Sequence, residues 1–244
     1  MLDLADWRRT VAGLYADVRR IGATDPAAAL EHWRAARERL FREHPQSPVP
    51  IPDRSDFRAR HFDPDPSMRF VVRVEPLDRP SAEALDPASA EALDPASAGP
   101  GLAAAPAIDF GGPARPTTPL PSTAIDLPVS GGGVMAFRRF GAVTVPLPGG
   151  ERRLEVYWME GYAGGLFLPF RDATNGTETY GAGRYLLDAA KAADLGGDRD
   201  AGSLILDFNF AFQPSCAFDP KWACPLAPPA NRLDLPIRAG ERLA

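Results

Sequence analysis

The sequence has few residues of the types that commonly mark a functional site. It contains two cysteines and three histidines among 244 residues, and it has no run of eighteen apolar residues. The missing apolar run argues against a membrane-spanning helix, and the N-terminal residues MLDLADWRRT lack the apolar core of a secretory signal. We therefore expect a cytoplasmic protein with no membrane partner.

The chain also has no excess of positive charge. Its formal net charge is −5, whereas binding to phosphate backbones requires a concentrated basic surface. Nucleic acid is therefore not an expected partner. Hydrophobic residues make up 45% of the chain, enough for a substantial core in one large domain or two small ones.

The two cysteines, Cys216 and Cys224, lie in one Pro-rich segment. A reducing cytoplasm disfavours a structural disulfide, although the even count leaves pairing open. A zinc site would need two more ligands at short spacing, and His32, His44 and His61 all lie far upstream. We expect two thiols packed near each other and no metal site.

Common catalytic signatures are missing as well. No serine lies in a G-x-S-x-G motif, and no histidine accompanies either cysteine as a local base. The glycines at 181 and 183 follow a Thr-rich turn, whereas a dinucleotide-binding loop follows a strand. The sequence therefore leaves open whether the protein is an enzyme, and it identifies no cofactor.

The N-terminal part, residues 1–45, is expected to be helical. Apolar residues recur at spacings of three and four over Asp3–Arg20, with Asp3 as a cap and Gly22 at the end. A second helix begins at Pro26 and ends before His44. Residues 46–76 then comprise a Pro-rich strap at 46–66 and a first strand at 68–75. In the strap, Phe57 and Phe62 are anchors and His61 is an exposed polar residue.

Residues 77–128 differ sharply in composition from the rest of the chain. The eight residues SAEALDPA at 81–88 are repeated at 89–96. An eight-residue period matches no solenoid repeat, and this composition has little apolar surface to bury. We expect a flexible insertion that loops out of a single domain spanning 46–244.

The β-rich core, residues 129–244, shows several short strand patterns with hairpin-length links. The expected strands are 134–140, 142–147, 153–159, 166–170, 185–187, 203–210 and 237–238. No strand alternates with a helix, which argues against a doubly wound sheet. The predicted fold is mainly β (α+β), an antiparallel, barrel-like curved sheet with the two N-terminal helices packed on one side.

The most informative stretch is FLPFRDATNGTETYGAGR, residues 167–184. An expected apolar strand is followed here by a polar turn. Five groups able to bind or move protons lie within fourteen residues: Arg171, Asp172, Glu178, Tyr180 and Arg184. Asp207 and Asn209 lie two apart in a later strand and therefore share one of its faces. We expect the first five to lie in one partly buried cluster with Asp207 or Asn209, and all seven are candidate ligand-binding residues.

Long stretches of the chain resemble the domain of unknown function 1684 family of bacteria and archaea. The resemblance is carried by LFLPFRDATNGTETYGAGRYLLD, LDFNFAFQPSCAFDPKWACPLAPPANRL and IRAGER, and it covers roughly residues 34–242 apart from the insertion. One departure is at residues 59–62, ARHF, where family members often read GL-x-Y-F. The resemblance implies a domain type and no activity.

Two hypotheses about the central polar residues stay open. In the first, a small-ligand-binding barrel domain uses arginine for an anionic ligand and a carboxylate for proton transfer. A flavin is one organic cofactor that such a barrel can hold, by fold-level analogy alone. In the second, the same charges pair among themselves in a non-catalytic structural or interaction module. The sequence does not determine the oligomeric state.

Overall fold

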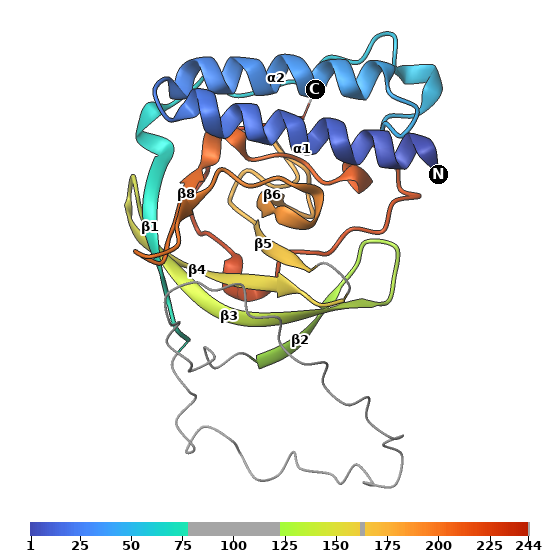
Figure 1. The fold of residues 1–244 in the computed structure, drawn as a ribbon. Coiled ribbons are helices and arrows are strands. Elements are labelled where there is room, and N and C mark those ends of the chain that lie inside the picture. The colour runs from blue at the N-terminus through green and yellow to red at the C-terminus, as the bar shows by residue number, and fades with distance from the viewer. Residues whose placement is uncertain (78–122, 162–163, 244) are drawn as a thin grey trace, which may run out of the picture.

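The computed structural model describes residues 1–77, 123–161 and 164–243, and Figure 1 shows its fold. Two helices, α1 (Leu2–Gly22) and α2 (Pro26–Glu43), lie side by side over one side of the molecule. Asp25 caps α2 by accepting a hydrogen bond from the Ala28 amide at 2.9 Å. The expected cap by Asp3 is wrong, because α1 begins at Leu2 and Met1 takes the cap position.

The described strands form one antiparallel, curled sheet that is an open half-barrel (Figure 1). Its order is β6-β5-β4-β3-β1-β8-β7, and β2 pairs with β3 outside this path. The strands are β1 (Arg69–Glu75), β2 (Thr123–Pro128), β3 (Val134–Leu147), β4 (Gly150–Met159), β5 (Gly165–Phe170), β6 (Arg184–Asp188), β7 (Gly197–Asp198) and β8 (Ser203–Asp207). The predicted fold class is confirmed.

Buried apolar residues form two clusters. The first joins the helices to the sheet, and it includes the Trp33 ring of α2, whose centroid lies 5.3 Å from that of Phe210. The second lies within the curl of the sheet, where Phe170 and Phe208 meet edge to face at 5.4 Å. Burial of these two apolar sets is the main favourable term in folding.

The strands expected at 134–140 and 142–147 are one long strand, β3. The pairing of β3 with β4 shifts register between Arg139 and Gly141. A Cβ atom at Gly141 would lie 2.5 Å from Val74 Cγ1 and 2.9 Å from the Glu75 carbonyl oxygen. Glycine at this point therefore allows β1 to pack closely against the bend in β3.

Two other strand predictions are wrong. The strand expected over 203–210 ends at Asp207, because the Asp207 side chain accepts the Asn209 amide at 3.0 Å and starts a 3₁₀ turn, Phe208–Phe210. Residues 237–238 form no strand. The carbonyl of Ile237 instead accepts a hydrogen bond from the Arg184 side chain at 2.7 Å.

Part of the expected insertion, 77–128, can be placed. Residues 123–128 form β2, whereas residues 78–122, including both copies of SAEALDPA, lie outside the described residues. Within the described ranges, the structure contains no helix with the length and apolar character that a membrane crossing requires.

Candidate functional site

Arg184, the first residue of β6, occupies the centre of the half-barrel and has a side chain with 0% exposure. Its guanidinium pairs with the Asp172 carboxylate at 2.8 Å, which is also fully buried. It also donates to three carbonyls of one C-terminal segment: Ile237 at 2.7 Å, Ala239 at 2.5 Å and Glu241 at 3.0 Å. We call this group the Arg184 centre. It anchors the C-terminal segment to the sheet.

The turn after β5 is held by its own side chains. Asp172 accepts from the Thr174 amide at 2.6 Å and from the Thr174 hydroxyl. Asn175 accepts from the Asp172 amide at 2.7 Å and donates to the Tyr180 carbonyl at 3.1 Å. These short-range bonds explain the Thr- and Asn-rich sequence, because such side chains replace backbone partners in tight turns.

Arg171 and Glu178 lie nearer the surface. Among the described residues, the Arg171 guanidinium donates to the Gly181 carbonyl at 2.9 Å and pairs with no carboxylate. Glu178 accepts two hydrogen bonds at 2.9 Å from Arg238; the Arg238 side chain is largely exposed and that of Glu178 is partly exposed. The hydrogen bonds from Arg238 hold the pKa of Glu178 below its usual value.

Asp207 and Asn209 belong to a different group. Asp207 pairs with Arg69 at 3.3 Å. Burial raises the pKa of the Asp207 carboxyl, although the hydrogen bonds that it accepts from Asn209 and Arg69 act in the opposite direction. Asn209 exchanges two hydrogen bonds with the backbone of Asp65, at 2.8 and 2.9 Å. This pair fastens the end of the strap to β8.

Tyr180 interacts with the Cys216 side chain, and burial raises the pKa of its phenol to about 12. The seven residues singled out from the sequence therefore divide among separate hydrogen-bonding groups. Asp172 and Arg184 are joined directly, and Asp207 is joined to Asn209. In the described part of the chain, no group of three or more His, Cys, Asp or Glu residues could hold a metal ion.

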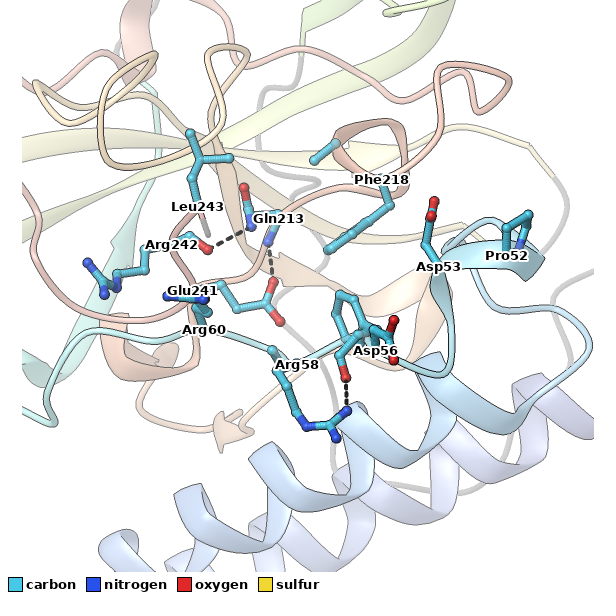
Figure 2. A pocket seen from close by; sticks show the side chains of 13 residues that line it. Pro52, Asp53, Asp56, Arg58, Arg60, Gln213, Phe218, Glu241, Arg242 and Leu243 are labelled. Atoms are coloured by element: carbon cyan, nitrogen blue, oxygen red, sulfur yellow. Dashed lines mark hydrogen bonds between the residues drawn. The ribbon is translucent and has the colours of Figure 1, made fainter.

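An open cleft of about 460 Å³ lies beside these groups (Figure 2). Its walls are the strap residues 52–60, the segment 213–218 and the C-terminal residues 241–243. The Arg242 amide donates to the Arg60 carbonyl at 2.9 Å, and the Phe62 amide donates to the Gly240 carbonyl at 2.9 Å. The strap and the C-terminal segment, about 180 residues apart in sequence, are thus bonded side by side.

The floor of the cleft carries a buried carboxylate. Glu241 is 3% exposed, forms a two-point ion pair with Arg37 of α2, and accepts the Gln213 amide at 2.8 Å. The Gln213 side chain donates to the Arg242 carbonyl at 3.2 Å, while its buried oxygen has no partner among the described residues. Figure 2 shows Gln213 between Glu241 and Arg242.

The rim of the cleft carries charges of both signs. Arg58, Arg60 and Arg242 line it, and within the described ranges none of them forms an ion pair with a carboxylate. Among the residues that the structure describes, Arg58 donates only to backbone carbonyls, one of them that of Phe57 at 2.7 Å. In Figure 2, Arg60 and Arg242 lie toward Leu243, and Asp53 and Asp56 lie on the opposite side.

His61 follows the cleft residue Arg60 in the chain and is half-buried. Its Nε2 atom is buried without a hydrogen-bond partner in the described part of the chain, and its ring meets Trp33 edge to face at 5.8 Å. Burial lowers the pKa of His61 to about 4, so the imidazole is neutral at pH 7. The expectation of an exposed polar histidine is therefore wrong.

Sequence reasoning did not find the cleft. Its available signals were the Pro-rich strap and the IRAGER motif, which contribute Arg60 and Arg242 to opposite walls. Neither segment shows by itself that it lies beside the other, because their pairing depends on the fold of the whole half-barrel.

Comparisons with known proteins agree with this architecture. The solution NMR structure of an uncharacterised protein of Haloarcula marismortui is similar, with a TM-score of 0.53 and 27% identity over 88% of this chain and 93% of that chain. No curated protein matches the chain. The family model "Protein of unknown function (DUF1684)" matches residues 105–242. The chain therefore belongs to the DUF1684 family.

Proposed function

We propose that the protein is a small-ligand-binding domain and that its ligand carries an anionic group held by Arg60 and Arg242 in the cleft. The observation that supports this most strongly is the set of cleft arginines without carboxylate partners within the described residues. Arg60 and Arg242 lie together on one side of the cleft, away from Asp53 and Asp56 (Figure 2), and can therefore present positive charge to a ligand there. Guanidinium groups bind carboxylates and phosphates through two parallel hydrogen bonds.

The other walls narrow the class of ligand. Phe57 and Phe218 provide apolar surface, and Asp53 and Asp56 lie across the cleft from Arg60 and Arg242. These carboxylates repel a ligand that is negative along its whole length. A volume of about 460 Å³ is within the usual range for small-molecule sites. The ligand class is a metabolite with one carboxylate or phosphate end and an apolar body.

The central turn has a supporting role in this proposal. The Arg184 centre holds the carbonyls of the C-terminal segment, and the Leu243 amide donates to the Glu178 carbonyl at 2.8 Å. Both contacts set the position of the wall that presents Arg242. Asp172, Glu178 and Arg184 therefore act as positioning residues, and the guanidinium groups of the cleft make the contacts to the ligand.

A thermal-shift screen tests the proposal with metabolites that carry one carboxylate or phosphate, each beside its neutral amide or dephosphorylated analogue. We expect at least one acid to raise the melting temperature while its neutral analogue does not. The double variant R60S/R242S should lose this shift. The variant R20S/R199S, which removes two exposed arginines elsewhere, should keep it. Equal binding by both variants would refute the assignment of the cleft.

The second hypothesis, a structural or interaction module without a ligand, is favoured by the pairing of charges within the Arg184 centre, although the Arg184 Nε atom has no hydrogen-bond partner among the described residues. Its buried charges have protein partners, as expected for a purely structural network. This hypothesis predicts that no acid in the screen binds, and that substitution of Arg60 and Arg242 changes no binding property.

A further inference from the structure

The two cysteines lie in contact in the segment that follows β8. Cys216 is in a 3₁₀ turn, Ser215–Ala217, and its amide donates to the Cys224 sulfur at 3.3 Å. Both are free thiols and are buried, at 6% and 3% exposure. The Cys224 amide donates to the Ser130 hydroxyl at 3.0 Å, which fixes the returning end of the loop.

Polar groups surround the Cys216 sulfur. The Cys224 thiol and the hydroxyls of Ser130 and Tyr180 lie close to it, and hydrogen bonding with these groups, most of all with Cys224, lowers the pKa of Cys216 to about 6 although burial opposes the shift. The same sharing of a proton raises the pKa of the Cys224 thiol. An apolar pocket would raise both pKa values, whereas these neighbours favour the thiolate form of Cys216, which is the nucleophilic form of a cysteine.

Further ionisable groups face the pair from neighbouring elements. The pKa of Cys224 is raised by its hydrogen bond with Cys216 and by burial, and the charge of Lys191, which pairs with Asp188 at 2.8 Å, opposes this shift only weakly. The Tyr185 hydroxyl donates to the Pro225 carbonyl at 2.5 Å, and burial raises the pKa of that phenol. Lys191 is thus the nearby cation, and the phenols stay protonated at neutral pH.

The geometry points to a redox-active dithiol, in which a hydroperoxide oxidises Cys216 and Cys224 resolves the product to a disulfide. The Cys216 thiolate attacks one peroxide oxygen, the O–O bond breaks, and the leaving oxygen takes a proton and departs as an alcohol, or as water if the oxidant is hydrogen peroxide. The sulfenic sulfur of Cys216 is then attacked by Cys224, which loses its proton as hydroxide leaves to form water. Two thiols and one hydroperoxide give one disulfide, one alcohol and one water.

This inference is independent of the cleft proposal. Ala217 and Phe218, which follow Cys216 directly, line the cleft, but the oxidation chemistry requires no ligand there. A protein that binds no acid can still oxidise at Cys216, and a protein that binds an acid can have unreactive thiols. Experiments can therefore refute the ligand-binding proposal without refuting the redox proposal, and the reverse.

Hydrogen peroxide is the probe for the test. Reduced protein is titrated with peroxide, the reaction is quenched, free thiols are alkylated, and the mass of the protein is measured by mass spectrometry. We expect a loss of two hydrogens and, because Lys221 lies between the cysteines, a tryptic product in which the two cysteine peptides are joined. The reaction should be at least tenfold faster than in the same chain unfolded in urea. An equal or slower rate in the folded protein would overturn the inference.

Three variants separate the roles of the groups. In C224S, Cys216 should stop at the sulfenic acid and be trapped by dimedone, whereas in C216S the remaining Cys224 should form no dimedone adduct. In Y180F, the midpoint of the pH–rate profile should move to higher pH while the melting temperature stays near that of the wild type. Trapping at Cys224 in C216S, or an unchanged pH profile in Y180F, would contradict the assigned roles.

Discussion

The Arg184 centre and the cleft both contain arginines, but the two regions satisfy their charges in opposite ways. Arg184 is fully buried and binds one carboxylate and three carbonyls of the C-terminal segment. Arg60 and Arg242 are on the cleft rim and pair with no carboxylate in the described part of the chain. A buried charge must have partners within the protein, whereas a rim charge is free to bind a ligand.

Glu241 connects the two regions. Its backbone carbonyl is bound by Arg184, while its side chain pairs with Arg37 and forms the floor of the cleft. The same segment is thus held rigidly on one side and open to solvent on the other. The polar stretch 171–184 therefore contributes to the buried Arg184 centre, which holds the C-terminal segment in place. The strap and residues 241–243, which stand out less in the sequence, form walls of the open cleft.

The largest expected effect is at the Arg184 centre. Arg184→Met leaves the Asp172 carboxylate buried without its cation and frees three carbonyls, which we expect to cost about 3–5 kcal/mol in the free energy of unfolding. Urea denaturation followed by circular dichroism measures this. Arg238→Met, at an exposed pair, is the control. A change at Arg184 no larger than the change at Arg238 would show that the centre is not what holds the C-terminal segment.

A smaller effect is expected from acid, through His61. Its folded pKa of about 4 lies below the ordinary value of 6.5, so between these values the unfolded chain binds a proton that the folded chain does not. Stability is therefore unaffected above pH 6.5 and falls as the pH drops from 6.5 to 4, by roughly 2–3 kcal/mol. His61→Phe should remove this part of the pH dependence. Parallel stability curves for the two proteins between pH 7.5 and 4.5 would contradict the prediction.

The cleft arginines should contribute little to stability. R60S/R242S is expected to change the free energy of unfolding by less than about 1 kcal/mol, because these exposed side chains lose no ion pair in the described structure and Arg242 loses only its contact with the Phe62 ring. Denaturation of this variant beside R20S/R199S measures the difference. A clear destabilisation confined to R60S/R242S would mean that the cleft charges serve the fold, as those of the Arg184 centre do.

The smallest effect is expected at the exposed pair. Glu178→Gln removes the ion pair with Arg238, and exposed pairs contribute little because solvent and salt screen them. The melting temperature should match that of the wild type within experimental error at 150 mM salt. A large drop in the melting temperature would show that the hydrogen bond between the Leu243 amide and the Glu178 carbonyl depends on the Glu178 side chain. Glu178 would then be one of the residues that stabilise the C-terminal segment.

The central turn shows how far local reasoning reaches. The Thr- and Asn-rich residues after β5 predicted a tight turn, and the bonds of Asn175 and Thr174 within it explain why those residue types occur. The proximity of Asp172 to Arg184 also follows from a short turn between paired strands. The remaining partners of Arg184, at positions 237–241, have no signal in that stretch, because a side chain can bind carbonyls of any sequence.

The sequence by itself determined the two helices, the curled antiparallel sheet, and the family, because periodicity, turn residues and long motifs are local properties of the chain. Only the tertiary structure decided which arginines are buried and paired, that Asp207 and Asn209 fasten the strap, and that Arg60 and Arg242 line one cleft. It also placed Cys216 against Tyr180 and Ser130. These outcomes depend on packing between segments that are far apart in sequence. The spacing of residues along the chain does not determine the distances in space between such segments.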